Sequence, residues 1–317
     1  MKDLKMRRML LQLALIPVAL VLGITVAYWW NHADEETATF EQAVPSLSYE
    51  HTNHLHGIGL DAETQRLILA THYGLFGLEN GQLYQLGARR DDFMGMSVDP
   101  NNPKRLFVSG HPPRGGNLGV LYSDDGGVSF TQVLSGVDNE IVDFHAMTIS
   151  PVDTQRVYGF YAGQLYQTVD AGNAWHLPAM EGLPGQGFCW GAPCLAADGH
   201  DADVIYAGTV DGALVSHDGG EQWRLLSDRT GAVAAIGSDL HVDQRLIAHT
   251  AEYGVAVSSD GGASWAAIND GLSFAQNDLV FAFVFDPLRP DVAYLATTGN
   301  QVYRTDDVSA GRWERLL

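Results

Sequence analysis

Histidines and carboxylates recur at matching places in three stretches of the sequence, in a pattern that could hold a metal ion. HLHGIGLD (54–61) carries two histidines two residues apart, so both imidazoles project from one face of a strand. RDDFMGMSVD (90–99) and DFHAMTIS (143–150) align with it when the ends of the stretches are superposed. The alignment places side chains at three levels: His54, Asp92 and Asp143; then His56, Met94 and His145; then Ile58, Met96 and Met147.

Two further histidines end the strands that come next, RLILATH (66–72) and RLFVSGH (105–111). An antiparallel second strand runs back to the level at which the first strand begins. Imidazole with thioether favours copper, whereas imidazole with carboxylate also suits zinc. We therefore predict a copper or zinc site on one face, built from His54, His56 and His145, with His72, His111, Met94 and Met96 as further candidate ligands.

The two aspartates of this set, Asp92 and Asp143, allow other interpretations. They could orient imidazoles from behind, or act as a general acid and a general base. The alternative to a metal site is a set of buried polar groups satisfied by hydrogen bonds, with methionines filling the core.

A five-fold repeat indicates which elements position these residues. Ser/Thr-x-Asp-x-Gly-x-x-Trp/Phe occurs four times, and a fifth copy is one residue longer. Successive aspartates are 42 to 48 residues apart, the length of a four-stranded propeller blade of about 40–50 residues. Each aspartate can accept hydrogen bonds from backbone N–H groups of a hairpin turn, and the glycine supplies a positive φ. The five aspartates are Asp125, Asp170, Asp218, Asp260 and Asp307.

The repeats SDDGGVSF (123–130), TVDAGNAW (168–175), SHDGGEQW (216–223) and SSDGGASW (258–265) resemble Asp-boxes, the BNR repeats of sialidase- and sortilin-type β-propellers. The chain is similar to bacterial glycosyl hydrolase-like BNR repeat proteins. This resemblance implies that the repeat aspartates are structural. Sialidases also carry an Arg-Ile-Pro motif and three substrate-binding arginines. The sequence has no Arg-Ile-Pro and few arginines, so an enzyme of this kind would not be a typical sialidase.

Six pairs of first and second strands between residues 51 and 317 indicate six blades. The first blade has LENGQLYQL (78–86) where its box would lie, so that box is degenerate. First strands line the axis of a propeller, and ring closure protects the sheet edges. The predicted fold is therefore all-β, a six-bladed β-propeller with Asp-box hairpins, and the metal site lies near its central channel.

An N-terminal transmembrane helix is expected before the propeller. Met9 to Trp30 is an uncharged run of 22 residues, and about 20 apolar residues span a bilayer. Basic residues precede the run and acidic residues follow it, which places the bulk of the chain outside the cytoplasm, in the periplasm or at the cell surface. Residues 1–30 are thus a signal anchor and 31–50 a tether, with a cleaved signal peptide as the alternative. In that compartment Cys189 and Cys194 can form a disulfide.

The charge of the chain and its glycine-rich stretch limit the classes of binding partner that we expect. The formal net charge of −20 disfavours contact with nucleic acid phosphates. The glycine-rich stretch HPPRGGNLG (111–119) follows no phosphate-loop pattern, so we expect no nucleotide cofactor. The partners that remain are the membrane, a metal ion and another protein.

Three functions remain open. The first is a membrane-anchored, extracytoplasmic binding protein that holds metal at the channel. The second is a glycoside hydrolase-like enzyme that uses Asp92 and Asp143 at the channel mouth. The third is a scaffold for assembly of a membrane protein complex, resembling photosystem assembly propellers or sortilin-type receptors. An acidic six-bladed chain departs from the seven blades and basic patch expected of the assembly factors, and the chain lacks the cysteines of sortilin-type receptors.

Overall fold

The computed structural model describes residues 54–317 except residues 138, 139 and 276. In this part of the chain, no helix combines the length and hydropathy needed to cross a membrane. The predicted anchor (1–30) and tether (31–50) lie outside the described residues.

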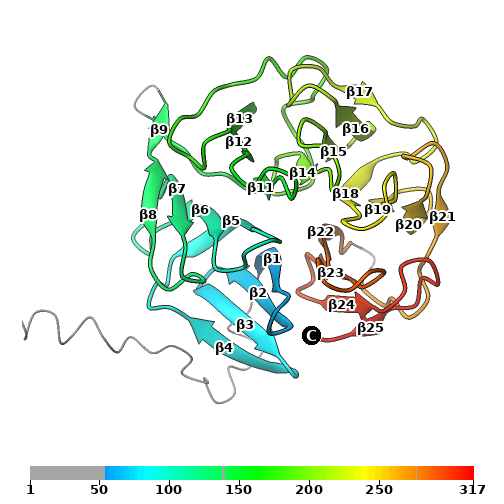
Figure 1. The fold of residues 1–317 in the computed structure, drawn as a ribbon, viewed down its shortest axis with the longest axis horizontal. Coiled ribbons are helices and arrows are strands. Elements are labelled where there is room, and N and C mark those ends of the chain that lie inside the picture. Colours follow the sequence, from blue (N-terminus) through cyan, green and yellow to red (C-terminus); the bar gives the residue numbers. More distant parts are fainter. Residues whose placement is uncertain (1–53, 138–139, 276) are drawn as a thin grey trace, which may run out of the picture. The chain divides into compact units, whose positions relative to one another are not determined.

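Six antiparallel β-sheets follow one another around a central axis (Figure 1), which confirms the predicted all-β six-bladed propeller. Every sheet keeps its strands in sequence order from the axis outwards, so each blade is a simple meander. Blades 1 and 2 consist of β1 (Leu55–Asp61), β2 (Arg66–Thr71), β3 (Gly74–Glu79) and β4 (Gln82–Leu86), and of β5 (Asp92–Val98), β6 (Leu106–His111), β7 (Val120–Ser123) and β8 (Thr131–Leu134).

Blade 3 is the exception, because its sheet has three strands, and a bridge between Gln167 and His176 stands where its fourth strand would pair. A short ribbon, β9 (Gly136–Val137) with β10 (Glu140–Ile141), precedes it. Blade 3 consists of β11 (Ala146–Ile149), β12 (Val157–Tyr161) and β13 (Gln164–Thr168). Blade 4 consists of β14 (Cys194–Ala197), β15 (Ile205–Thr209), β16 (Gly212–Ser216) and β17 (Arg224–Leu225). Blades 5 and 6 consist of β18 (Val233–Ser238), β19 (Leu246–Thr250), β20 (Gly254–Ser258) and β21 (Ala266–Ala267), and of β22 (Val280–Phe285), β23 (Ala293–Thr297), β24 (Val302–Thr305) and β25 (Glu314–Arg315).

The core lies between blades, because the side chains of one strand alternate between two neighbouring blades. In β6, Leu106 and Val108 join Ile68 of blade 1, whereas Phe107 joins Phe144 of the next blade. All five side chains are buried. Both faces of an inner strand are therefore covered, which explains why these strands read as continuous apolar runs.

Four of the six innermost strands carry a β-bulge near their first residues. The register shifts fall on His56 in β1, Met94 in β5, Ala234 in β18 and Phe281 in β22. A bulge leaves one residue outside the ladder and re-aims its side chain. In blade 1 that re-aimed residue is a histidine.

The repeat aspartates lie in the hairpins that leave the third strands. Each of the first four accepts a hydrogen bond of 2.8–3.0 Å from the backbone N–H four residues later, at Ser129, Ala174, Gln222 and Ser264. The glycines two residues after them have φ between +89° and +102°. In the longer fifth copy, Asp307 instead accepts from the backbone N–H groups of Ser309 and Ala310.

Ring closure joins blade 6 to blade 1 by side chains. The backbone N–H groups of His54 and Leu55 donate to Oδ1 of Asn300 at 3.0 and 2.7 Å. Gln65 donates to Asp286 at 3.2 Å and accepts from Arg289. Among the described residues, no sheet mixes strands from the two ends of the chain.

Candidate metal site at the channel mouth

At two places, a histidine of one blade contacts an aspartate of the next blade. Nδ1 of His72, which follows β2, lies 3.1 Å from Oδ2 of Asp92, the first residue of β5. One blade further on, Nε2 of His111 lies 3.1 Å from Oδ2 of Asp143. The pairing repeats because the end of each second strand meets the start of the next blade's first strand. Repetition of the blade has therefore duplicated a histidine–aspartate pair.

A third ligand residue extends each pair into a group whose ligand atoms lie within 4.8 Å of one another. The first group is His56, His72 and Asp92, and the second group is His111, Asp143 and His145. The structure therefore brings together six of the residues that the sequence pointed to, as two sets of two imidazoles and one carboxylate.

The first group centres on a histidine whose ring lacks hydrogen bonds. His56 is 5% exposed, and neither of its ring nitrogens has a hydrogen-bond partner among the residues that the structure describes. Its Nε2 lies 4.0 Å from Oδ1 of Asp92, another buried atom without a hydrogen bond. Burial first, and then the charge of His72, lower the pKa of His56 to about 3. The ring is therefore neutral at physiological pH and keeps a lone pair for a ligand.

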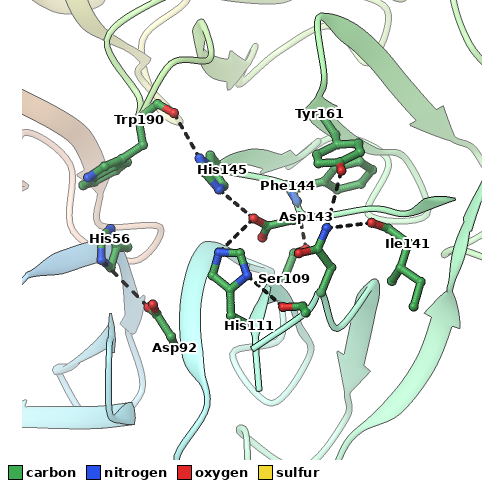
Figure 2. Close-up of polar contacts among 12 residues, drawn as sticks. His56, Asp92, Ser109, His111, Ile141, Asp143, Phe144, His145, Tyr161 and Trp190 are labelled. Atoms are coloured by element: carbon green, nitrogen blue, oxygen red, sulfur yellow. Dashed lines mark hydrogen bonds and ion pairs between the residues drawn. The ribbon is translucent and has the colours of Figure 1, made fainter. Parts of the chain in front are cut away.

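The second group is held by backbone carbonyls, as Figure 2 shows. Nδ1 of His145 lies 3.0 Å from the carbonyl oxygen of Trp190, and Nδ1 of His111 lies 2.9 Å from that of Gly116. A carbonyl only accepts, so both Nδ1 atoms carry the proton. Both Nε2 atoms are left to face Oδ2 of Asp143, at 2.7 Å from His145 and 3.1 Å from His111.

Histidine ligands of metal ions usually have this arrangement, because a hydrogen bond from one ring nitrogen fixes the tautomer that presents the other. Burial lowers the pKa of His145, but its hydrogen bonds to Asp143 and to the Trp190 carbonyl outweigh burial, and the net pKa is raised. Without an ion, a proton thus holds Nε2 against Asp143. An ion would take the place of that proton.

Electrostatic coupling links the two groups. Burial raises the pKa of Asp92, and the nearby charge of His72 opposes that shift. The charges of His111, His145 and Asp143 also act on Asp92. Oδ1 of Asp92 and Oδ1 of Asp143 are buried, and neither has a hydrogen-bond partner in the described part of the chain. These oxygens need a cation or an added donor for full satisfaction.

Three predicted ligands lie outside the two groups. Asp92 contacts the preceding blade, blade 1, and His54 likewise contacts the preceding blade, blade 6, through its backbone N–H. The ring centroid of His54 lies 5.0 Å from that of His72, but His54 belongs to neither ligand group. Met94 occupies the bulge of β5, and Met96 packs against Gly57. The ligand atoms of the two groups are nitrogen and oxygen, and such a set favours zinc or copper(II) over copper(I).

Trp190 contacts both ligand groups, and the sequence did not single it out. Besides its carbonyl contact with His145, its indole ring lies 4.5 Å from the ring of His56 and 5.0 Å from that of Phe281. It sits in the loop closed by a disulfide between Cys189 and Cys194. The sequence did indicate that FCWGAPC, which contains Trp190, lies near this face. The direction of the Trp190 carbonyl could not be predicted, because residue types do not determine it.

The site opens into a cavity along the propeller axis. The cavity has a volume of about 180 Å³. His56, His145 and Trp190 line it together with the innermost strands. An ion held by either group would therefore be reachable from the cavity.

Comparison with known proteins gives similarities of two kinds. No family model matches the chain. A xyloglucanase from Paenibacillus sp. is 31% identical over 202 residues, which is 60% of this chain and 19% of that protein. The chain therefore spans about a fifth of the length of the curated relative that it matches.

Solved structures share the fold at low sequence identity. A GH74 xyloglucanase from Xanthomonas campestris superposes with a TM-score of 0.55 at 17% identity, over 86% of this chain and 46% of that one. YCF48 from Cyanidioschyzon merolae superposes with a TM-score of 0.54 at 16% identity, over 87% and 88% of the two chains. YCF48 bound to D1 peptide gives a TM-score of 0.52 at 13% identity, over 88% and 85%. These likenesses concern the propeller fold and leave the activity to the site itself.

Proposed function

We propose that this protein is a metal-binding β-propeller that holds a divalent ion of the zinc or copper(II) class at its channel mouth. One observation carries the proposal. His111 and His145 both donate Nδ1–H to backbone carbonyls and direct Nε2 at the same oxygen of buried Asp143. Two imidazoles and one carboxylate leave an open position on the ion, as in catalytic zinc sites.

The group of His56, His72 and Asp92 supplies a second, adjacent binding position. Its imidazole at His56 is buried, neutral and without a hydrogen bond. The duplicated histidine–aspartate pair makes the two positions chemically alike. We therefore propose up to two ions per chain.

Anchorage by residues 1–30 and an extracytoplasmic location form part of the proposal. The charge distribution around the uncharged run Met9 to Trp30 supports it, as does the disulfide between Cys189 and Cys194. Membrane fractionation of cells, with alkaline extraction and protease accessibility, tests this part. Recovery of the chain in the soluble cytoplasmic fraction would contradict it.

Calorimetric titration of the chelator-stripped full-length chain with Zn²⁺ and Cu²⁺ tests the metal site. We expect saturable binding of up to two ions per chain, one of which is lost in a His111→Gln, His145→Gln double variant. Equal binding by the double variant and the unmodified chain would end the proposal. The ion with the higher affinity decides between zinc and copper(II).

Glycoside hydrolysis is the second candidate, because the xyloglucanase from Paenibacillus sp. is 31% identical over 202 residues. Asp92 has the raised pKa that suits a general acid. The test is release of reducing sugar from xyloglucan by the full-length chain, with Asp92→Asn and Asp143→Asn variants as controls. Hydrolysis that both variants abolish favours this function, and no hydrolysis leaves metal binding as the proposed role.

A further inference from the structure

We infer that the disulfide between Cys189 and Cys194 is a redox-sensitive clamp on the metal site, and that its reduction by a dithiol weakens metal binding. The inference rests on the proposed metal site and adds a regulatory element to it. The clamp consists of the loop 189–194, whose two ends the disulfide joins.

One residue of the loop contacts both ligand groups. The carbonyl oxygen of Trp190 lies 3.0 Å from Nδ1 of His145, and the indole ring lies 4.5 Å from the ring of His56. The carbonyl accepts the Nδ1 proton of His145, so that Nε2 is presented to an ion. A change in the backbone at Trp190 therefore acts directly on a metal ligand.

The backbone conformation at Trp190 is an unfavourable one for a bulky residue. Cys189 and Ala192 exchange two backbone hydrogen bonds, of 2.9 and 3.0 Å, so Trp190 and Gly191 are the two central residues of a tight turn. Their φ angles are +49° and +94°. Turns with positive φ at both central residues favour Asn-Gly, and a bulky side chain is strained at the first of them.

The disulfide ties this turn to a blade. Cys194 is the first residue of β14 and pairs with Gly208 of β15, so the bond joins the turn to the innermost strand of blade 4. After reduction, noncovalent contacts alone hold Trp190 in its strained conformation. Relaxation to a negative φ would turn its carbonyl away from His145, which frees the imidazole to rotate.

The axial cavity gives a reductant its route to the disulfide. Both cysteines line the cavity, as do His145 and Trp190. Cys189 is 5% and Cys194 is 3% exposed, so we expect a small dithiol to react slowly and a protein reductant more slowly still.

Reduction is an ordinary thiol–disulfide exchange. A thiolate of the dithiol attacks one sulfur of the pair, the S–S bond breaks, and a mixed disulfide forms. The second thiol of the reductant resolves this intermediate and leaves with its partner as a cyclic disulfide. Two electrons and two protons pass to the protein, which then carries Cys189 and Cys194 as thiols.

Zinc affinity of the oxidised and the reduced full-length chain tests the inference. Dithiothreitol is the reductant, and gel filtration without oxygen removes it because it binds zinc itself. A chromogenic reagent counts the free thiols, of which the chain can have two. We expect the reduced chain to bind at least one zinc ion at least ten times more weakly, and reoxidation to restore the affinity. An unchanged or higher zinc affinity in protein with two free thiols would overturn the inference.

Two variants separate the clamp from other effects of reduction. The Cys189→Ser, Cys194→Ser double variant has no disulfide, so it should match the reduced chain and should not respond to dithiothreitol. Trp190→Asn places a residue at the turn that suits a positive φ. Its reduced form should therefore keep its zinc affinity within threefold of its own oxidised form. A tenfold loss in reduced Trp190→Asn would overturn the role of strain at Trp190. If the double variant does not fold, the comparison of oxidised with reduced wild-type chain decides.

Thermodynamic linkage gives an independent readout. If reduction lowers zinc affinity tenfold, bound zinc must disfavour reduction of the disulfide by the same factor. For a two-electron couple, a tenfold change corresponds to about 30 mV. Equilibration with mixtures of reduced and oxidised glutathione, with and without saturating zinc, measures this shift. An equal potential under the two conditions would contradict the inference.

Failure of this inference differs from failure of the proposed function. Zinc is titrated into the oxidised chain first, and absence of binding there ends both. Zinc binding that reduction leaves unchanged keeps the proposed function and rejects the clamp.

Discussion

His111 and Asp143 meet across the boundary between blades 2 and 3, with Nε2 and Oδ2 3.1 Å apart. His72 and Asp92 repeat that separation across the boundary between blades 1 and 2. In blade 3, Ala162 takes the place of the histidine, so this blade does not supply the imidazole of such a pair. The duplicated pair is therefore confined to one side of the axis, where it forms the candidate metal site.

Loss of one imidazole from the second group should weaken metal binding strongly. Since His145→Gln removes one of three ligands, we expect zinc affinity to fall at least about 100-fold, more than the loss typical of a partner behind the ligand. Competition against a chromogenic chelator measures the affinity. His200→Gln is the matched control, because His200 is exposed on the opposite loops and should leave affinity unchanged.

Removing Asp92 should separate the two binding positions. Asp92 belongs only to the group with His56 and His72, so Asp92→Asn should lower the zinc content from two ions to one per chain. Elemental analysis after gel filtration gives the ratio. An unchanged ratio of two ions would show that this group does not hold the second ion.

The disulfide should support the metal site more than the fold. Its loop contains Trp190, whose carbonyl fixes the tautomer of His145. We expect Cys189→Ser to lower zinc affinity about 10- to 100-fold, while the short loop contributes about 2 kcal/mol to unfolding. Zinc titration and urea denaturation of the same variant separate the two effects, and an unaltered zinc affinity would contradict the role of the loop.

The blade-5 hairpin should show acid sensitivity. Hydrogen bonds from Ser264 and Ser258 lower the pKa of Asp260 to about 2, below the unfolded value of about 3.9. Its contribution to stability is therefore complete above about pH 4 and is lost as the pH falls through about 2. The urea midpoint of Asp260→Asn should lie below that of the unmodified chain at pH 7 and approach it near pH 2.5. A constant difference between those pH values would exclude this linkage.

A glycine beside the site should tolerate no side chain. A Cβ on Gly95 of β5 would lie 2.2 Å from the carbonyl oxygen of Phe144, next to Asp143. Gly95→Ala should therefore push blades 2 and 3 apart, at a cost of about 3 kcal/mol, and should weaken zinc binding. Gly185→Ala is the control, because Gly185 also lies outside the positive-φ region and its Cβ would meet no atom closer than 3.5 Å. Thermal unfolding and zinc titration report the two effects.

The repeat made the fold predictable. Regular spacing of the box aspartates identified the blades, and antiparallel pairing placed His72 and His111 at the level where the first strands begin. Six of the residues drawn from this alignment converge in the two ligand groups. The periodicity of the sequence therefore predicted both the number of blades and the face of the propeller on which the candidate ligand residues lie.

The sequence did not predict which ligands belong to the same group. Each group joins residues from two neighbouring blades, whereas the alignment only shows which residues lie at the same height along their strands. His54 occupies the place in blade 1 that Asp92 occupies in blade 2, yet the residue of blade 6 that corresponds to His72 is Thr298, which has no imidazole. Local backbone geometry was equally hidden from the sequence. The bulge that re-aims His56 and the carbonyl direction at Trp190 are properties of φ and ψ, which residue types alone do not determine.

Closure of the ring by side chains has a mechanical consequence. Within residues 54–317, no sheet takes strands from both blade 1 and blade 6. The seam between these blades therefore relies on contacts such as those of Asn300 and Arg289. A pull on the segment that precedes blade 1 would load this seam first and peel away the blade that carries His56 and His72. A metal ion bound at the proposed site would then be released under tension before the remaining blades unfold.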